Sequence, residues 1–429
     1  MNAAWHTATA RTPPGRRLVQ VLAILAVAGL AVWASWQGAP LPASIPIPER
    51  PPAPSSDRSL PEVSELARSP LSATELKSYF QMLARQKGAP YAYDVLRSAL
   101  LPPDTDLHLL GHYIGDVLYQ QQGAAGMRVC TREFRNACSH SIVVAMFGER
   151  GEAALPEIAE ACRGAPGGSG AYTMCFHGLG HGVLASVGYN LPEAVRLCAK
   201  TGTRGREYRE YHECGGGAIM EIISGGDHSK ALWASERQTY LAAGEPLSPC
   251  SRNFVPAKVK PICYLYLTPW LWEAVGADLG RPAPQDHERA MRLCQGIRAS
   301  ETASRETCYG GFGKEFIVLV PGRDIRRIEE LTDRELNLVH EWCNLAPDRV
   351  ASAACVVYAM YSLYWGGEND RAVAIRFCGL APDGFLKDAC VKNLIRVVSI
   401  YIQDADYRRG FCQELDASYR QACRGELGT

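Results

Sequence analysis

Sixteen cysteines in a chain of 429 residues constrain the fold more than any other feature of the sequence. In chain order they form eight consecutive pairs, and the pairs recur at a spacing typical of repeats built from two helices. The sequence contains no C-x-x-C motif and no tight thiolate cluster, which argues against metal or iron–sulfur ligation by cysteine. We therefore predict eight disulfides: Cys130–Cys138, Cys162–Cys175, Cys198–Cys214, Cys250–Cys263, Cys294–Cys308, Cys343–Cys355, Cys378–Cys390 and Cys412–Cys423.

The segments beside the cysteines predict helical hairpins. "LPEIAEAC" (Leu155–Cys162) and "LPEAVRLC" (Leu191–Cys198) are near copies, and Pro followed by Glu is typical of a helix start. Each second cysteine begins a run of small and apolar residues, and most runs end in Gly, as helix C-termini do. We expect an all-α fold, an α-solenoid of about eight to nine hairpins. In each hairpin, the disulfide would join the end of the first helix to the start of the second, here called the B helix.

Hairpins with one disulfide each resemble the Sel1-like repeats of the Helicobacter cysteine-rich proteins. "VCTREFRNACSH" (Val129–His140) has the C-x7-C spacing of that family, whereas the other seven pairs are wider. The resemblance covers the plan of residues 126–429 rather than their motifs. The resemblance implies a secreted α/α repeat protein that binds a partner. It implies no catalytic residues for this chain.

The N-terminal region predicts export across a membrane. Arg11, Arg16 and Arg17 precede the apolar stretch 18–36, whose length suits a bilayer span. Positive charge ahead of the span would keep the N-terminus in the cytoplasm. A signal peptide cleaved after Ala34 is the alternative. The predicted organisation is a cytoplasmic tail (1–17), a transmembrane anchor or signal peptide (18–36), a Pro/Ser-rich linker (37–70) and an extracytoplasmic helical-repeat domain (71–429).

Charge and compartment narrow the classes of function. The chain has 45 basic and 45 acidic residues, so no basic surplus suggests a nucleic-acid partner. Disulfides persist outside the cytoplasm, which agrees with the predicted export signal. We expect a single-pass protein of the inner membrane whose body lies in the periplasm or extracellular space.

Histidines recur in the early B helices. His140 and His177 each lie two residues after the second cysteine of their pair, and His181 lies one turn further on. His108 and His112 repeat the four-residue gap and the preceding Leu-Gly, with Asp106 in the place of the cysteine. Residues four apart share a helix face, so imidazoles from neighbouring helices can converge on one zinc, copper or iron ion. The later residues Glu221 and Glu315 carry carboxylates near the same face.

Each of these features also has a structural explanation. A buried histidine commonly binds a backbone carbonyl, and repeats duplicate residues by descent. The glycines of "CFHGLGHG" (Cys175–Gly182) would lie in the first turn of a B helix, where they permit close helix packing or expose backbone N–H groups to an anion.

Two classes of function follow from the sequence. The first is a membrane-tethered scaffold that presents a concave groove to a protein or envelope partner. The second is a metalloprotein or metalloenzyme that uses His108, His112, His140, His177 and His181. The sequence lacks G-x-S-x-G, H-E-x-x-H and dinucleotide-binding motifs, so it identifies no catalytic residues.

Overall fold

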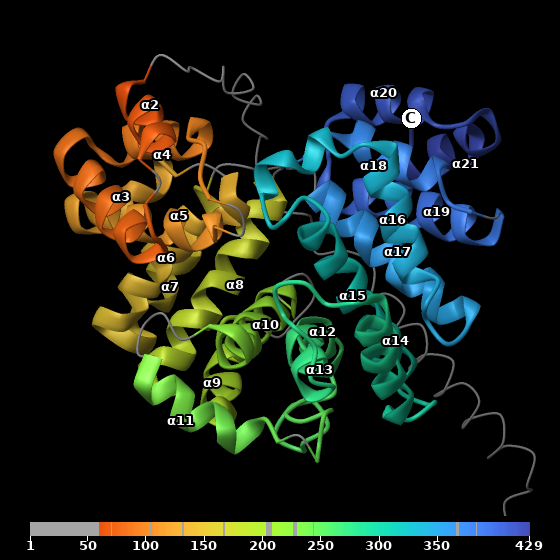
Figure 1. Ribbon diagram of the computed structural model, residues 1–429, viewed down its shortest axis with the longest axis horizontal. Coiled ribbons are helices and arrows are strands. Elements are labelled where there is room, and N and C mark those ends of the chain that lie inside the picture. The colour runs from red at the N-terminus through yellow and green to blue at the C-terminus, as the bar shows by residue number, and fades with distance from the viewer. Residues whose placement is uncertain are drawn as a thin grey trace, which may run out of the picture. The chain divides into compact units, whose positions relative to one another are not determined.

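The computed structural model describes residues 60–69, 71–102, 105–130, 133–165, 168–202, 208–225, 230–242, 244–365, 369–382 and 384–429. All regular secondary structure in these ranges is helical (Figure 1), which confirms the all-α class. The elements are α2 (Pro61–Arg68), α3 (Ala73–Lys87), α4 (Ala89–Ser98), α5 (Leu107–Gln122), η1 (Gly123–Arg128), α6 (Glu133–Arg150), η2 (Gly151–Ala154), α7 (Leu155–Arg163), α8 (Gly168–Ser186), α9 (Leu191–Cys198), α10 (Tyr208–Ser224), α11 (Lys230–Tyr240), α12 (Lys260–Tyr266), α13 (Thr268–Ala274), α14 (Pro284–Leu293), η4 (Cys294–Gly296), α15 (Thr302–Leu319), η5 (Ile325–Glu330), α16 (Asp333–Cys343), α17 (Arg349–Tyr364), α18 (Arg371–Gly379), α19 (Gly384–Tyr401), α20 (Ala405–Glu414) and α21 (Ala417–Leu427).

All eight predicted disulfides are present, and they account for every cysteine of the chain. Their Cα–Cα distances of 5.4–5.9 Å lie in the usual range for a disulfide. Each bond joins two segments that are close in the chain, so the hairpin is the covalent unit of the fold.

The position of the disulfide within the hairpin differs from the prediction in two respects. The second cysteine lies inside the B helix rather than at its start: α8 begins at Gly168, seven residues before Cys175. The residues ahead of the cysteine extend the helix toward its N-terminus, as Thr302 and its successors do in α15. In addition, Cys250 lies in a series of turns between α11 and α12, whereas the prediction ends a helix there.

Consecutive B helices pack against one another along the chain. The series runs α5, α6, α8, α10, α12, α15, α17 and α19, and the first helices of the hairpins lie beside it (Figure 1). This arrangement confirms the helical repeats. Burial of one B helix against the next explains why their sequences are rich in small and apolar residues.

Early and late hairpins also contact one another directly. The guanidinium of Arg135, in α6, donates to the hydroxyl of Ser362 in α17 at 3.2 Å and lies 4.7 Å from the ring centre of Trp365. Arg326 donates to the carbonyl oxygens of Leu96 and Ala99 at 3.0 and 2.8 Å. In an open solenoid each repeat contacts only its neighbours, so these hydrogen bonds show a series of hairpins that turns back on itself.

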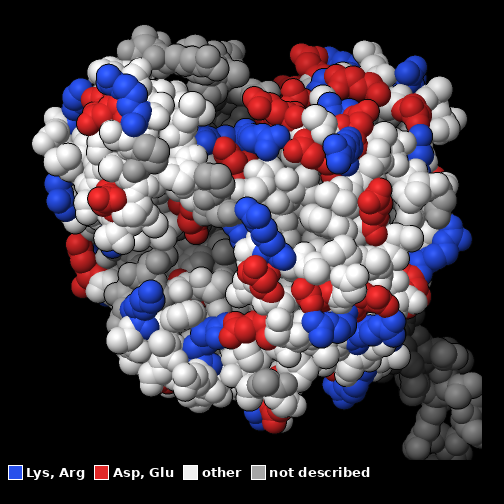
Figure 2. Space-filling model, in the orientation of Figure 1, with Lys and Arg blue, Asp and Glu red and all other residues white. Residues whose placement is uncertain are grey.

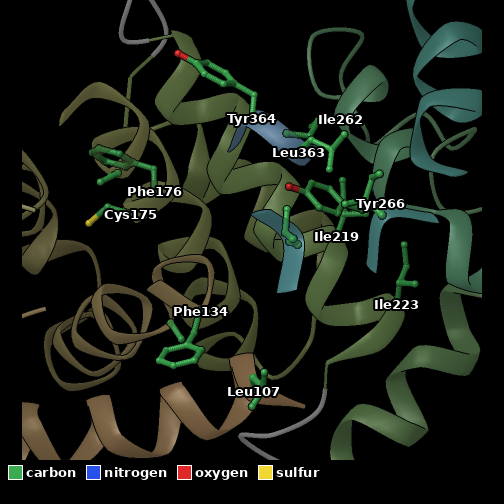
Figure 3. Close-up of a cluster of buried hydrophobic side chains, with 14 of the residues drawn as sticks. Leu107, Phe134, Cys175, Phe176, Ile219, Ile223, Ile262, Tyr266, Leu363 and Tyr364 are labelled. Atoms are coloured by element: carbon green, nitrogen blue, oxygen red, sulfur yellow. The ribbon is translucent and has the colours of Figure 1, made fainter. Parts of the chain in front are cut away.

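The core extends through all the hairpins. Figure 3 shows side chains of early, middle and late hairpins in one cluster, including Phe134, Ile219 and Leu363. On the face shown in Figure 2, basic and acidic side chains are interspersed, in agreement with the balanced composition.

The range predicted as a linker, 37–70, contains a helix near its C-terminal end, and its residues before 60 lie outside the described residues. Helix α2 lies inside that range, and its Val63 and Leu66 are buried because the helix presents an apolar face to the core. The predicted tail (1–17) and apolar span (18–36) lie outside the described residues. Among the residues that are described, every helix is too short or too polar to cross a bilayer.

Candidate metal centre

Five histidine rings from three consecutive B helices form one group. His108 and His112 come from α5, His140 from α6, and His177 and His181 from α8. Ring centres of neighbouring members lie 4.6–6.2 Å apart. One ring nitrogen from each of His108, His112 and His140 lies within 4.8 Å of the other two. The structure therefore brings together all five histidines that the sequence singles out.

Hydrogen bonds determine which ring nitrogen of His108 and His112 carries the proton. The Nδ1 atom of His108 lies 2.6 Å from the carbonyl oxygen of Phe134, which can only accept, so His108 donates from Nδ1. The Nδ1 atom of His112 lies 3.1 Å from the hydroxyl oxygen of Ser141. That hydroxyl donates to the carbonyl oxygen of His112 at 2.8 Å, so it accepts from Nδ1. In their neutral forms, both rings consequently have a lone pair on Nε2.

The two Nε2 atoms lie 3.1 Å apart. Two lone pairs at this distance repel each other unless a positive charge lies between them. Burial is the main cause of the lowered pKa of His108, which disfavours a shared proton. A tetrahedral ion with bonds of about 2.0–2.1 Å would hold two imidazole nitrogens about 3.3 Å apart. His108 and His112 thus have the geometry of two ligands of one ion.

An unusual turn supplies the carbonyl that orients His108. Phe134, Arg135 and Asn136 all have left-handed backbone conformations, with φ angles of 54°, 54° and 62°. Each non-glycine residue in this conformation costs roughly 1–2 kcal/mol, least for Asn. The disulfide Cys130–Cys138 encloses the turn and so limits the alternatives available to it. Strain of this kind is common at functional sites, and the sequence carries no signal for it.

His140, the member of the group that comes from α6, is its most deeply buried ring. It is 1% exposed, and within the part of the chain that the structure describes neither of its ring nitrogens has a hydrogen-bond partner. Burial, followed by the neighbouring histidines, holds its pKa well below the usual range, so the ring is neutral. An unsatisfied buried polar atom costs about 1–3 kcal/mol, which favours a ligand for His140.

A carboxylate lies near the Nδ1 atom of each of the two histidines of α8, but only that of Glu221 is at hydrogen-bond distance. The Nδ1 atom of His181 lies 3.0 Å from Glu221, whose other carboxylate oxygen accepts a hydrogen bond from Tyr189 at 3.1 Å. The Nδ1 atom of His177 lies 3.6 Å from Glu213, a longer contact, and burial lowers the pKa of His177 to about 4. A carboxylate at Nδ1 is the usual partner of a metal-binding imidazole, because it leaves the Nε2 lone pair for the ion. The Nε2 atom of His181 is buried and has no hydrogen-bond partner among the residues that the structure describes.

Contacts between B helices show which positions are equivalent in the repeats. A Cβ atom on Gly180 would lie 2.0 Å from the carbonyl oxygen of Cys214, the second cysteine of the next hairpin. Gly313 has the same relation to Cys355, also at 2.0 Å. Both glycines lie five residues after the second cysteine of their own hairpin. In both pairs of neighbouring B helices, the same position of one helix therefore faces the cysteine of the next.

This register corrects the predicted alignment of the first hairpin. Gly115 is the residue that faces the carbonyl oxygen of Cys138, with a Cβ distance of 3.1 Å. Counting back five residues places Leu110, rather than Asp106, at the position of the cysteine. Asp106 instead caps α5 by accepting a hydrogen bond from the backbone N–H of Leu109. His112 is therefore the equivalent of His140 and His177, while His108 precedes this position by one turn and His181 follows it by one turn.

The glycines beside the histidines lie in mid-helix rather than in the first turn. A Cβ atom on Gly178 would lie 2.5 Å from the ring of His140, and one on Gly217 would lie 1.9 Å from the carbonyl oxygen of His177. These positions are too far from a helix N-terminus to bind an anion through free N–H groups. Their absent side chains let α6, α8 and α10 approach closely enough for the five rings to meet.

A pocket of about 180 Å³ gives access to the group from solvent. His108, His112 and His181 line it, whereas His140 and His177 do not. Its walls carry further polar side chains, among them Lys77, Asp106, Asp116 and Ser141. A small polar molecule can therefore reach the histidines of α5 and α8.

The two predicted carboxylates have different places. Glu221 contacts His181 and acts as its hydrogen-bond partner rather than as a direct ligand. Glu315 pairs with Lys314 in α15 and is not part of the histidine group. Three groups that contact the histidines were not predicted from the sequence: Ser141, Glu213 and the carbonyl of Phe134. Only Ser141 has a sequence signal, since it directly follows His140.

Comparison with known proteins gives no relative for this chain. No family model, no curated protein and no solved structure matches it.

Proposed function

We propose that this protein binds a transition-metal ion through the imidazoles of α5, α6 and α8. The observation that carries the proposal is the 3.1 Å separation of the Nε2 atoms of His108 and His112, whose Nδ1 atoms both donate to other groups. Imidazole suits zinc, copper and iron. His140 is the third member of this ligand set, since its nitrogen lies within 4.8 Å of the other two.

The pocket beside the three histidines favours a metal site at which the ion can also bind water or a small molecule. Structural zinc sites are closed by four protein ligands, whereas catalytic sites keep one position for water or substrate. Three imidazoles beside a polar pocket match the second pattern. We therefore favour a metalloprotein with an exchangeable ligand over a purely structural metal site.

Metal analysis of the full chain, expressed with its disulfides formed, tests the proposal. The wild type should retain zinc, copper or iron after desalting, measured by mass spectrometry at one ion or more per chain. The double variant His108→Ala/His112→Ala should lose the ion that these two histidines bind. His287→Phe is the matched control, because His287 is buried elsewhere in the fold. Equal and negligible metal contents in all three proteins would refute metal binding.

The predicted scaffold role remains the second candidate. Consecutive packing of the B helices supports an α-solenoid, and the eight disulfides support a location outside the cytoplasm. A groove for a protein or envelope partner requires a free inner face. The contacts of Arg135 with Ser362 and Trp365 occupy part of the space between early and late hairpins, so we place the metal centre first.

A further inference from the structure

His140 lies between two pairs of histidines. On one side are His108 and His112, whose ring centres are 5.5 and 5.6 Å from that of His140. On the other are His177 and His181, at 5.9 and 6.2 Å. From this placement we infer that the group holds two metal ions, with the ring of His140 as a bridging ligand between them. The inference rests on the proposed function and adds a second ion.

The ring spacings fit two sets of three ligands. Imidazoles bound to one tetrahedral ion have ring centres about 5.2 Å apart, given metal–nitrogen bonds of about 2.0–2.1 Å. The first set, His108, His112 and His140, has spacings of 4.6, 5.5 and 5.6 Å. The second set, His140, His177 and His181, has spacings of 5.9, 6.2 and 5.1 Å. The second set needs its rings to close by no more than about 1 Å, a side-chain movement rather than a change of fold.

The hydrogen bonds assign the bridging role to His140. His108 and His112 each engage Nδ1 with a protein acceptor, and His181 engages Nδ1 with Glu221, so each of these rings offers only Nε2. His140 differs because both of its nitrogens are buried without a partner among the described residues. A single ion would satisfy one nitrogen and leave the other unsatisfied, whereas two ions satisfy both.

An unpartnered histidine alone does not make such a site, as His287 illustrates. Its two nitrogens also lack partners in the described ranges, but its ring packs among Trp272, Phe316 and Trp342, which supply no ligand atoms. His140 has four further imidazoles around it.

The bridge requires His140 to lose its remaining ring proton, which passes to solvent as the second ion binds.

Copper(II) is the probe for this inference, because an imidazolate bridge couples the spins of two copper ions. The full chain is titrated with copper(II), desalted, and analysed for copper by mass spectrometry and for unpaired spins by electron paramagnetic resonance. The wild type and the His287→Phe control should bind two coppers per chain with a spin count well below two. His140→Ala should show every bound copper in the spin count.

A second variant keeps the test decisive if His140→Ala does not fold. The double variant His177→Ala/His181→Ala should bind one copper with a full spin count, because the first ligand set remains. One copper per wild-type chain, or two coppers with a full spin count, would overturn the bridge and leave the proposed function intact. A wild type that binds no metal would overturn both.

Discussion

The imidazole of His140 packs directly on the backbone of Gly178 in the neighbouring helix. A Cβ atom on Gly178 would lie 2.5 Å from Cδ2 of His140 and 2.7 Å from its Cα atom. Real Cβ atoms do not approach other atoms this closely, so any side chain at 178 must displace the ring or separate α6 from α8. The glycine thereby fixes the place of the central histidine of the group.

Replacement of Gly178 by alanine should weaken metal binding. The added methyl group pushes the His140 ring away from the ligands of α5, and we expect a loss of affinity of about tenfold or more. Competition titration with a chelator of known affinity measures the change. Gly148→Ala is the control, because Gly148 is exposed in α6 and no atom lies within 4 Å of its added Cβ. Unchanged affinity in Gly178→Ala would show that the ring position does not matter for the ion.

Gly180→Ala should lower the stability of the fold. A methyl group 2.0 Å from the Cys214 carbonyl oxygen forces α8 and α10 apart, and overpacking of this kind costs about 1–3 kcal/mol or more. Gly148 offers a matched comparison, since it is exposed in α6 and no atom lies within 4 Å of an added Cβ. Gly148→Ala should raise the free energy of unfolding by about 0.5–1 kcal/mol through helix propensity. Urea denaturation of both variants measures the contrast, and a similar effect of the two substitutions would contradict the close contact.

Glu221→Gln should reduce the affinity for the second inferred ion, the one bound by His140, His177 and His181, by about 10–100-fold with little effect on the fold. The glutamine keeps the shape of Glu221 but removes the charge that holds the Nδ1 proton of His181. Glu315→Gln is the control, because Glu315 pairs with Lys314 outside the group. Chelator competition on both variants provides the measurement. Equal affinities would exclude Glu221 as a partner of a metal-binding histidine.

His287 should make the protein less stable in acid. Burial among aromatic rings lowers its pKa to about 4, so the folded chain keeps the ring neutral while the unfolded chain protonates it near pH 6.5. The unfolded state thus binds more protons between these two values. The free energy of unfolding therefore falls as the pH drops from about 6.5 to about 4, by about 3 kcal/mol for this residue.

His287→Phe removes this titration and should reduce the loss of stability in acid by that amount. Urea denaturation of wild type and variant at pH 7 and pH 4.5 gives the difference. Any packing cost of the larger ring is the same at both pH values and cancels in the comparison. If the two proteins lose equal stability between these pH values, His287 is protonated in the folded state.

Local features of this chain could be predicted from the sequence. Each disulfide joins cysteines that are close in sequence, and helix signals such as the repeated "LPE" segments act over a single turn, so the hairpins follow from short-range chemistry. The register of the histidines placed all five candidates in one group. The predicted alignment of the first hairpin was wrong. Leu-Gly precedes both His112 and His181, but in the packed structure His112 is equivalent to His177, one turn before His181.

The sequence by itself determined the helical class, the eight disulfides and the set of histidines, because each depends on the spacing of residues along the chain. Only the tertiary structure decided what each ring can do. The carbonyl of Phe134, the hydroxyl of Ser141 and the carboxylate of Glu221 select the proton position of their histidines, and they come from other helices. The contact of Arg135 with Ser362 spans 227 residues, a separation that no local pattern encodes. Packing brings such groups together, and it thereby decides which ring nitrogen carries the lone pair and where that lone pair points.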